Sequence, residues 1–417
     1  MIAIEEVHVS KKDKSILRGL ACRVAEIGDL SLQEEKAEMW RRHNGLERVR
    51  PMVLIFPEGA WRELLPQSDL ACESELARHY EFDLRARLYY WDHMQDDNVI
   101  EPTVPSQIIM HNTGWGIQSK RTAPEDALGA YRIDPVIRDE SDVDKISTPQ
   151  VTVDWAATEQ RFSVLQEVFG DTLTVEKRGQ FNYGIDPLDH YATVRGIDQM
   201  FLDLVDHPGM VHKAVGKLVD GHIAMLKAME EQGALSLGNR NHYVGSGGTG
   251  YTHQLPRPDF DGTHVRTVDL WGFAAAQTFS EVSPAMHEEF ALRHEKRLLE
   301  FFGLNCYGCC EPLHDKLGIV KTIPNLRRVS ISPWADVERS AEELGDRYVF
   351  SWKPNPALIA AESWDPDAVR NQIRTFLEKT RGCIVEMIMK DTHTSRHQPQ
   401  RMWDWVRIAR EEAEAFA

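Results

Sequence analysis

Short runs of β-branched and aromatic residues alternate with long amphipathic helical patterns along most of this 417-residue chain. Strand-like runs separated by helical stretches predict a parallel sheet, and eight of them predict a (β/α)8 TIM barrel, an α/β fold. An open sheet is the less favoured alternative. The eight runs are MVLIF (52–56), SQIIM (106–110), TLTVE (172–176), ALSLGN (234–239), LNCYG (304–308), RRVSIS (327–332), YVFSW (348–352) and CIVEMIM (383–389).

Two segments do not follow this repeat. Residues 1–50 contain two helical patterns, so we expect an N-terminal helical extension that packs on a barrel formed by residues 51–417. The stretch 242–272 predicts an irregular insertion after the fourth strand, and insertions at a barrel rim often shape the substrate pocket. Its GSGGTG (245–250) lacks the Lys-Ser/Thr ending of a phosphate-binding loop, and we interpret it as a flexible lid turn.

Charge and composition exclude several classes of function. The formal net charge is −17, whereas a nucleic-acid-binding protein needs a basic face to neutralise phosphates. No apolar run is long enough to predict a membrane span. The first fifteen residues lack the apolar segment of a signal peptide, so we expect a cytoplasmic protein whose cysteines stay reduced.

Polar or aromatic residues follow nearly every predicted strand. In a TIM barrel these positions form the carboxyl-terminal face, where the active site lies. Glu58, after the first strand, is a candidate catalytic acid. For Lys353, in KPNP, contact with substrate or with solvent is equally consistent with the pattern. The candidates for substrate binding are His111, Trp115, Glu176, Tyr183 and Lys353.

The stretch GLNCYGCCEPLHDKL (303–317) is the strongest candidate for a metal site. Cys309 and Cys310 follow the fifth predicted strand, and His393 follows the eighth. Zn²⁺ takes thiolate and imidazole ligands, and a catalytic zinc keeps one position open. Successive side chains on a strand point to opposite faces, so we expect only one of the two cysteines to bind the ion, and we favour Cys309.

Other interpretations of these residues stay open. Glu311 and Asp391 are each predicted as a third ligand or a general acid. Cys306 and Cys309 have the CxxC spacing of a redox motif, but such a motif opens a helix, and here it lies within a predicted strand. Free cysteines are also among the most buried residue types, and any of them is consistent with an inert core.

Three longer motifs carry a resemblance to a known family: RGIDQMFLDLVDHPGMVHKAV (195–215), DLWGFAAAQTFSEVSPAMHEEF (269–290) and WKPNPALIA (352–360). In their order along the chain, these segments resemble the uroporphyrinogen decarboxylase superfamily, and within it the corrinoid-dependent methyltransferases. The decarboxylase itself is disfavoured, because the first strand ends in PEGAW (57–61) where that branch has an arginine-rich opener.

The resemblance also implies a ligand set. Zinc methyltransferases of this superfamily have a His-x-Cys-Gly motif after the fifth strand and a further cysteine after the last. Here Tyr307 stands at the histidine position, and Asp391 and His393 replace the last-strand cysteine. The resemblance therefore implies a changed ligand set, built from Cys309, from Glu311 or Cys310, and from His393.

The resemblance implies a methyltransferase that moves a methyl group from a small O-, N- or S-methylated compound to cob(I)alamin, with zinc assistance. The chain has no Asp-x-His-x-x-Gly cobalamin-binding motif, so the cobalamin would be carried by a separate corrinoid protein. Barrels of this superfamily commonly form homodimers. Two alternatives remain: a metal-independent decarboxylase or lyase that uses the rim acids and Lys353, and a non-catalytic binding subunit of a corrinoid complex.

Overall fold

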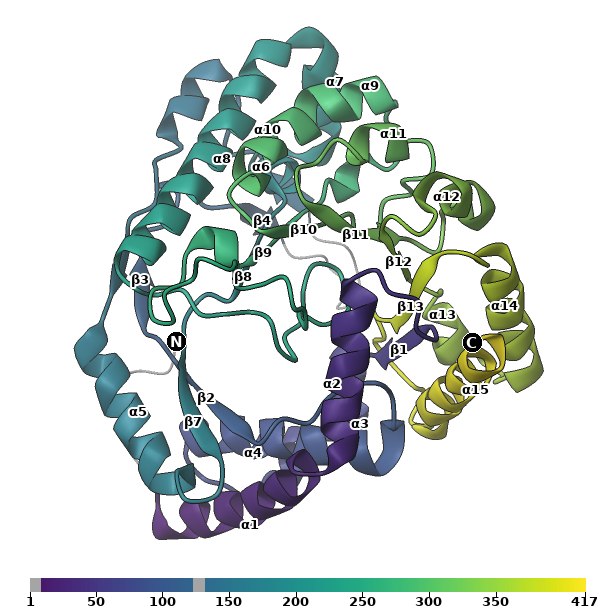
Figure 1. Cartoon of the computed structure of the whole chain (residues 1–417). Helices are drawn as coiled ribbons and strands as arrows, with labels where there is room; N and C mark the ends of the chain where they lie inside the picture. Colours follow the sequence, from purple (N-terminus) through teal and green to yellow (C-terminus); the bar gives the residue numbers. More distant parts are fainter. Residues whose placement is uncertain (1–8, 123–131) are drawn as a thin grey trace.

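The computed structural model describes residues 9–122 and 132–417, and the first eight residues of the predicted N-terminal extension lie outside this range. Its main sheet has seven parallel strands that curve around a common centre (Figure 1). In sheet order they are β1 (Met52–Ile55), β13 (Ile384–Met389), β12 (Val349–Trp352), β11 (Leu326–Ile331), β10 (Leu304–Tyr307), β9 (Trp271–Ala274) and β8 (Asn182–Ile185).

A separate parallel pair, β2 (Thr103–Gln107) and β7 (Thr174–Arg178), lies on the remaining side of this ring in Figure 1. A single bridge joins Gln180 to Leu235 beyond the end of β7. Within the described residues, the hydrogen-bonded ladder does not close, because β1 pairs only with β13 and β2 pairs only with β7. The fold is therefore a mixed α/β fold that is compatible with a TIM barrel, and we call its strands the ring.

Seven of the eight predicted runs overlap observed strands. The prediction at 234–239 is wrong, because only Leu235 forms a bridge there. Strands β8 and β9 were not predicted. Each has only four residues, and β9 leads into the alanine-rich segment 274–276, which favours a helix.

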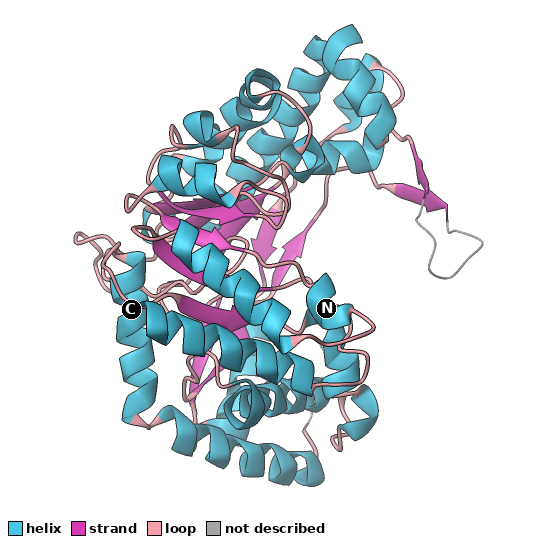
Figure 2. Cartoon of the chain, turned by 90° about the vertical axis from the view of Figure 1, so that its right-hand side faces the viewer, coloured by secondary structure: helices cyan, strands magenta, loops and turns pink. Residues whose placement is uncertain are grey.

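Helices surround the ring (Figures 1 and 2). They bury one face each, as their amphipathic patterns predict. Within the described residues no helix is long and apolar enough to cross a membrane. The α-helices are α1 (Lys11–Gly28), α2 (Ser31–Asn44), α3 (Trp61–Leu64), α4 (Glu75–Tyr89), α5 (Trp155–Phe169), α6 (Pro187–Arg195), α7 (Ile197–Asp206), α8 (Pro208–Glu231), α9 (Pro284–His287), α10 (Arg293–Leu299), α11 (Leu317–Val320), α12 (Val337–Leu344), α13 (Ala357–Ala360), α14 (Pro366–Lys379) and α15 (Gln400–Phe416).

Two short antiparallel pairs lie apart from the ring. Strand β3 (Met110–Asn112) pairs with β6 (Val151–Val153). Strand β4 (Lys120–Thr122) pairs with β5 (Arg132–Asp134), and this hairpin projects from the body of the molecule in Figure 2.

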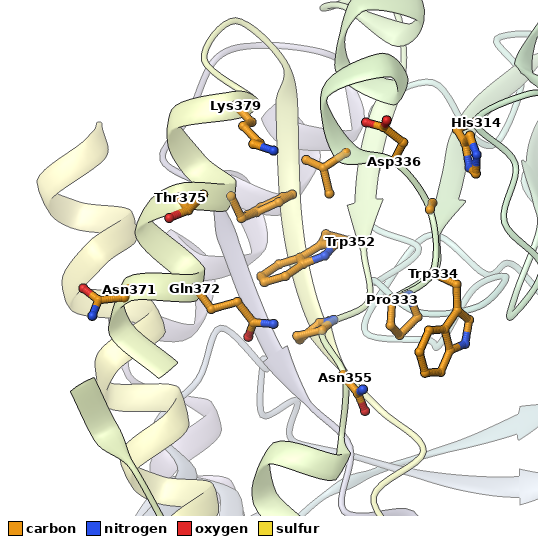
Figure 3. Close-up of a pocket in the computed structure, with 14 residues that line it drawn as sticks. His314, Pro333, Trp334, Asp336, Trp352, Asn355, Asn371, Gln372, Thr375 and Lys379 are labelled. Atoms are coloured by element: carbon orange, nitrogen blue, oxygen red, sulfur yellow. The ribbon is translucent and has the colours of Figure 1, made fainter. Parts of the chain in front are cut away.

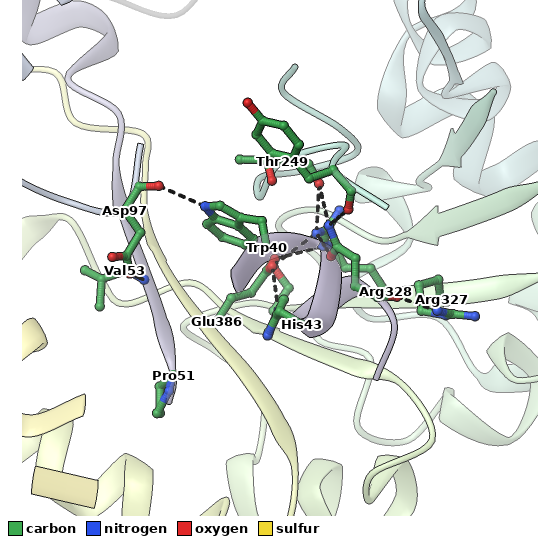
Figure 4. A network of polar contacts seen from close by, with 12 residues as sticks. Trp40, His43, Pro51, Val53, Asp97, Thr249, Arg327, Arg328 and Glu386 are labelled. Carbon is green, nitrogen blue, oxygen red and sulfur yellow. Dashed lines mark hydrogen bonds and ion pairs between the residues drawn. The ribbon is translucent and has the colours of Figure 1, made fainter. Parts of the chain in front are cut away.

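The two N-terminal helices have different positions. Helix α1 packs outside the ring, where Leu17, Ala21 and Val24 share an apolar cluster with residues of α4 and α5. Helix α2 instead ends against residues inside the ring, and Trp40 Nε1 donates a hydrogen bond to the Asp97 carbonyl (2.8 Å; Figure 4). The division into a 1–50 extension and a 51–417 barrel stays a prediction.

A buried ionic network, which we call the floor, lies where α2 meets the ring (Figure 4). Arg328 Nε lies 2.9 Å from Glu386 Oε1, and Arg328 Nη2 donates to Asn44 Oδ1 at 2.7 Å. His43 Nε2 lies 3.2 Å from Glu386 Oε2. These side chains are almost completely buried. A buried charge is tolerated only when it is paired and hydrogen-bonded, so the two strands and the helix are held together here.

The GSGGTG segment (245–250) runs through the interior of the ring. Asn44 Nδ2 donates to the carbonyls of Thr249 (3.0 Å) and Tyr251 (2.7 Å). Gly248 has φ +84°, and a Cβ there would lie 2.7 Å from Arg328 Cζ. Most of the segment is buried, so the interpretation as a flexible lid turn is wrong. Glycine is needed at this position because the chain passes so close to Arg328.

Candidate active site

The two adjacent cysteines lie just beyond the carboxyl end of β10. The strand ends at Tyr307, and Gly308 turns the chain with φ +88°. The sulfurs of Cys309 and Cys310 lie 3.6 Å apart on the same side of the chain. We expected the two side chains to point in opposite directions, as they do along a strand. That expectation is wrong, because both residues lie outside the strand.

Three neighbours polarise the Cys309 thiol. The Cys310 thiol and the Ser246 hydroxyl (3.4 Å) hydrogen-bond to its sulfur, and Lys390 Nζ lies 3.7 Å away. Together, in that order of effect, they lower the pKa of Cys309 to about 5, against the opposing effect of burial. A thiol with a pKa this low is ionised at neutral pH, and the thiolate is the reactive and metal-binding form.

Glu311 lies behind the loop that carries the two cysteines, in the protein interior. It is completely buried, and its oxygens accept hydrogen bonds from the backbone N–H groups of Cys309 (2.9 Å) and Ala276 (3.2 Å). Burial raises the pKa of Glu311 to about 7. Its contacts fit a group that positions the cysteine loop, in place of the predicted contact with substrate or metal.

Tyr307, the last residue of β10, points into a buried cluster. Its hydroxyl donates to Glu295 Oε2 (2.8 Å) and lies 2.6 Å from His287 Nε2. Burial raises the pKa of Glu295 to about 8 and lowers that of His287 to about 3. Tyr307 therefore supports the loop from below and does not reach the sulfurs.

Charged groups from two further strand ends lie around the cysteines. Lys390 and Asp391 follow β13, with Lys390 Nζ 3.5 Å from Asp391 Oδ1. Glu58 follows β1, and its carboxylate accepts a hydrogen bond from the Asp391 backbone N–H. Burial raises the pKa of Glu58. We call these groups, together with Cys309, Cys310 and Asp186, which follows β8 (Asn182–Ile185), the mouth.

Lys353 lies between the mouth and the floor. Its side chain is buried, and Nζ donates to the Ser351 carbonyl (3.1 Å) and hydroxyl (2.6 Å). Burial lowers the pKa of Lys353 to about 7. The predicted contact with substrate therefore requires that Nζ leave these partners.

Sequence reasoning missed Asp186, Ser246 and Lys390 as site residues. Asp186 follows β8, and burial, followed by the charge of Asp189, raises its pKa to about 6, with Cys309 adding to the shift. The sequence does not indicate the short strand β8, so Asp186 does not stand out as a residue at a strand end. Ser246 reaches Cys309 only because the 245–250 segment enters the ring, and Lys390 was visible in KDTHT (390–394) without any indication of its partner.

The structure does not bring the predicted zinc ligands into a ready set. His393 is exposed and packs against Gly59. A Cβ added to Gly59 would lie only 2.8 Å from His393 Nδ1. Across residues 9–122 and 132–417, no group of three or more His, Cys, Asp or Glu side chains is arranged to hold a metal ion. The sulfurs of Cys309 and Cys310 are adjacent, but a third ligand does not converge on them.

The remaining predicted substrate-binding residues lie elsewhere. His111, on β3, is exposed and lies 3.7 Å from Asp154. Trp115 packs its ring on His190 and His222.

Tyr183 is a core residue whose hydroxyl lies 3.0 Å from His222 Nδ1. Glu176 pairs with Arg240 (2.8 Å) and lines a pocket beside Thr103 and Thr174, at the starts of β2 and β7. None of these four side chains has a described contact with either cysteine of the mouth.

A pocket of about 680 Å³ lies between the loops after β11 and β12 and helix α14 (Figure 3). Trp352 stacks on Phe376 in its wall, with ring centroids 3.9 Å apart, while Trp334 is 68% exposed at its edge. Neither cysteine lines this pocket. Trp334 thus borders a cavity outside the ring.

Comparison with known proteins supports the fold. Among solved structures, the chain is similar to a methyltransferase from Methanosarcina mazei, with a TM-score of 0.50 and 10% sequence identity over 91% of this chain and 98% of that one. No protein family matches the chain by sequence. No curated protein matches it either. At this identity, the likeness describes the arrangement of strands and helices alone.

Proposed function

We propose that this protein is a methyltransferase with a uroporphyrinogen decarboxylase-like TIM barrel. It takes a methyl group from a small O-, N- or S-methylated compound and transfers it to cob(I)alamin on a separate corrinoid protein. The sequence motifs described above and the fold of the M. mazei methyltransferase support this proposal. The observation that carries it is the Cys309 sulfur in contact with Lys390 and Ser246 at the carboxyl end of the ring.

The thiolate and the acids of the mouth have separate roles in this proposal. Loss of a methyl group leaves the donor heteroatom in need of a proton when it departs as an alcohol or amine. Burial raises the pKa of Asp186 to about 6, so this carboxyl group is able to supply that proton near neutral pH. Burial also raises the pKa of Glu58. Cys309 places a negative charge where a methyl group bound to a positive or polarised heteroatom would be held.

Glu311 is a positioning residue in this mechanism. Its hydrogen bond to the Cys309 N–H fixes the loop that presents the two sulfurs. Cys310, Ser246 and Lys390, in that order of effect, lower the pKa of the Cys309 thiol. Cob(I)alamin, when brought by its protein, supplies the methyl acceptor.

Zinc at the mouth stays a prediction. Zinc bound to thiolate would polarise the donor heteroatom as a Lewis acid. The described residues supply only two adjacent sulfurs and not a complete ligand set, so we assign no step to the metal. Elemental analysis of the protein beside Cys309→Ala tests it: about one zinc per chain, lost in the variant, would restore a metal role.

The proposal is tested by a screen of methylated compounds with free cob(I)alamin, in which methylcobalamin is measured by absorbance. We expect transfer by the wild-type protein and a loss of at least about 100-fold in Cys309→Ser, since a hydroxyl stays protonated where a thiol ionises. The matched control is Cys22→Ser, an exposed cysteine on α1. Equal transfer by Cys309→Ser and Cys22→Ser would refute the role of the mouth.

One observation favours a second candidate, a metal-independent decarboxylase or lyase. Lys353 has a pKa lowered to about 7, so a neutral amine is available at physiological pH. Such an amine can act as a base or attack a carbonyl group. Release of CO2 from a carboxylic acid substrate, lost in Lys353→Met but kept in Cys309→Ser, would favour this candidate over methyl transfer.

A further inference from the structure

Cys309 and Cys310 are the only two cysteine sulfurs that a contact joins in the described part of the chain. All six cysteines are free thiols. Cys22 is exposed but alone on α1, and Cys306 is buried against Arg328 inside the ring. The pair at the mouth therefore combines two properties that the others lack together, a neighbouring sulfur at 3.6 Å and access from outside.

We propose that Cys309 and Cys310 form a site of reversible oxidation that reacts with low-molecular-weight disulfides. The Cys309 thiolate attacks one sulfur of the small disulfide, forming a mixed disulfide and releasing one thiolate. The Cys310 thiol then loses its proton and attacks Cys309 Sγ, which expels the second thiolate. The protein dithiol is oxidised by two electrons, the small disulfide is reduced to two thiols, and one bond links the adjacent cysteines.

The local geometry favours the first step at Cys309 and the second at Cys310. Ser246 and Lys390 lie at the Cys309 sulfur, and both stabilise the thiolate that attacks. Cys310 is the more exposed of the two and has its sulfur on the same side of the turn. Since both residues follow the end of β10, closing the bond does not require breaking a strand ladder.

The same geometry makes the bond easy to reverse. Consecutive Cα atoms are about 3.8 Å apart across a trans peptide, whereas disulfide-linked Cα atoms usually lie about 4.4–6.8 Å apart. A disulfide between neighbours is therefore strained, and strained, exposed disulfides are more readily reduced than structural ones. The site is suited to switching between two states and not to stabilising the fold.

Oxidation would also change the mouth. A disulfide removes the negative charge from Cys309 and ties its sulfur to Cys310. The effect of oxidation on activity rests on the proposed function, in which the Cys309 thiolate takes part in methyl transfer. The oxidised protein would lose methyl transfer, and a reductant would restore it. The covalent change itself can be measured without any activity.

The experiment exposes the full-length protein to glutathione disulfide, blocks remaining thiols, and cleaves after Tyr307, which separates Cys306 from the pair. Mass spectrometry should show the loss of two hydrogens in the fragment with Cys309 and Cys310, reversed by dithiothreitol. Cys310→Ser should instead retain glutathione on Cys309. Cys22→Ser serves as the matched control and should behave as the wild-type protein.

Three results would overturn the inference. The wild-type protein could keep glutathione on Cys309 without forming the Cys309–Cys310 disulfide, or leave both cysteines unmodified while Cys22 reacts. A disulfide that joins the two fragments on either side of the Tyr307 cleavage would identify Cys306 as the partner. Formation of the Cys309–Cys310 disulfide in a protein that transfers no methyl group would support the oxidation site and refute only the proposed function.

Discussion

The floor and the mouth of the ring use polar groups in opposite ways. At the floor, Arg328, Glu386 and His43 are each at most 2% exposed, and Glu386 meets both of the others. At the mouth, Cys310 is exposed and the Asp391 side chain is 47% exposed. The floor pairs Arg328 with Glu386 inside the protein, whereas the mouth leaves the Cys310 thiol and the Asp391 carboxylate accessible.

This difference separates stability from chemistry. Buried charges that pair with one another join helix α2 to strands β11 and β13, away from solvent. Accessible groups whose pKa values are shifted by their surroundings are typical of functional sites. Cys309, Asp186 and Glu58 have this character, so changes at the floor should alter folding and changes at the mouth should alter reactivity.

The largest effect is expected from Glu386→Gln. The substitution leaves the Arg328 guanidinium buried without its counter-charge, and breaking a buried pair in this way costs about 3–5 kcal/mol. Urea unfolding followed by circular dichroism measures the loss. The matched control is Glu338→Gln, which removes an exposed partner of Lys379 (3.7 Å) and should cost less than about 1 kcal/mol. Equal losses in the two variants would contradict the role of the floor.

The pH dependence of the floor sharpens this prediction. Burial opposes ionisation of Glu386, but Arg328 and His43 outweigh it and lower the pKa of Glu386 to about 2. Its stabilising contribution is therefore present above the ordinary value of 4.5 and disappears as the pH falls from 4.5 toward 2. The gap in unfolding midpoint between the wild type and Glu386→Gln should narrow over this window. A constant gap would show that Glu386 is not ionised.

The sequence identified most strands but not the floor. Hydrophobic runs such as 304–308 and 383–389 became β10 and β13, because their alternation with helices directly reflects a parallel sheet. The pairing of Arg328 with Glu386 joins residues far apart in the sequence, and no local pattern indicates it. Only the folded chain shows that the GSGGTG segment enters the ring beside them.

At the mouth, the sequence identified the cysteines but not their environment. The sulfur-rich stretch that follows a predicted strand indicates Cys309. The expectation that Cys310 would point away was wrong, because the strand ends before both residues. Lys390 and Ser246 were missed, since their proximity to Cys309 depends on β13 and on the inserted segment, and not on spacing along the chain.

A smaller effect is expected from Lys390→Met. Cys310, Ser246 and Lys390 lower the pKa of Cys309 to about 5, so alkylation by iodoacetamide should rise through about pH 5 and then level off. Removing the ammonium should move this midpoint upward by about one pH unit. Mass spectrometry of the Cys309 fragment measures the rate, with Lys379→Met as the control. A profile with its midpoint above pH 8 in the wild type would contradict a thiolate at the mouth.

The smallest effect is expected for the stability of Cys309→Ser. The thiol is only half-buried and its sulfur contacts are weak hydrogen bonds, so the free energy of unfolding should fall by less than about 1 kcal/mol. Urea unfolding measures this free energy for Cys309→Ser and for Cys306→Ser. The second variant provides the comparison, because Cys306 is buried against Arg328. A larger loss in Cys309→Ser than in Cys306→Ser would assign Cys309 to the core.

The most direct test compares Glu386→Gln with Cys309→Ser, with methyl transfer to cob(I)alamin and the unfolding midpoint measured for both variants. The predicted result is a separation of effects: Glu386→Gln unfolds more easily but transfers methyl groups while folded, and Cys309→Ser is as stable as the wild type but inactive. The result that would contradict the account is full methyl transfer by Cys309→Ser, since the mouth would then have no part in the chemistry.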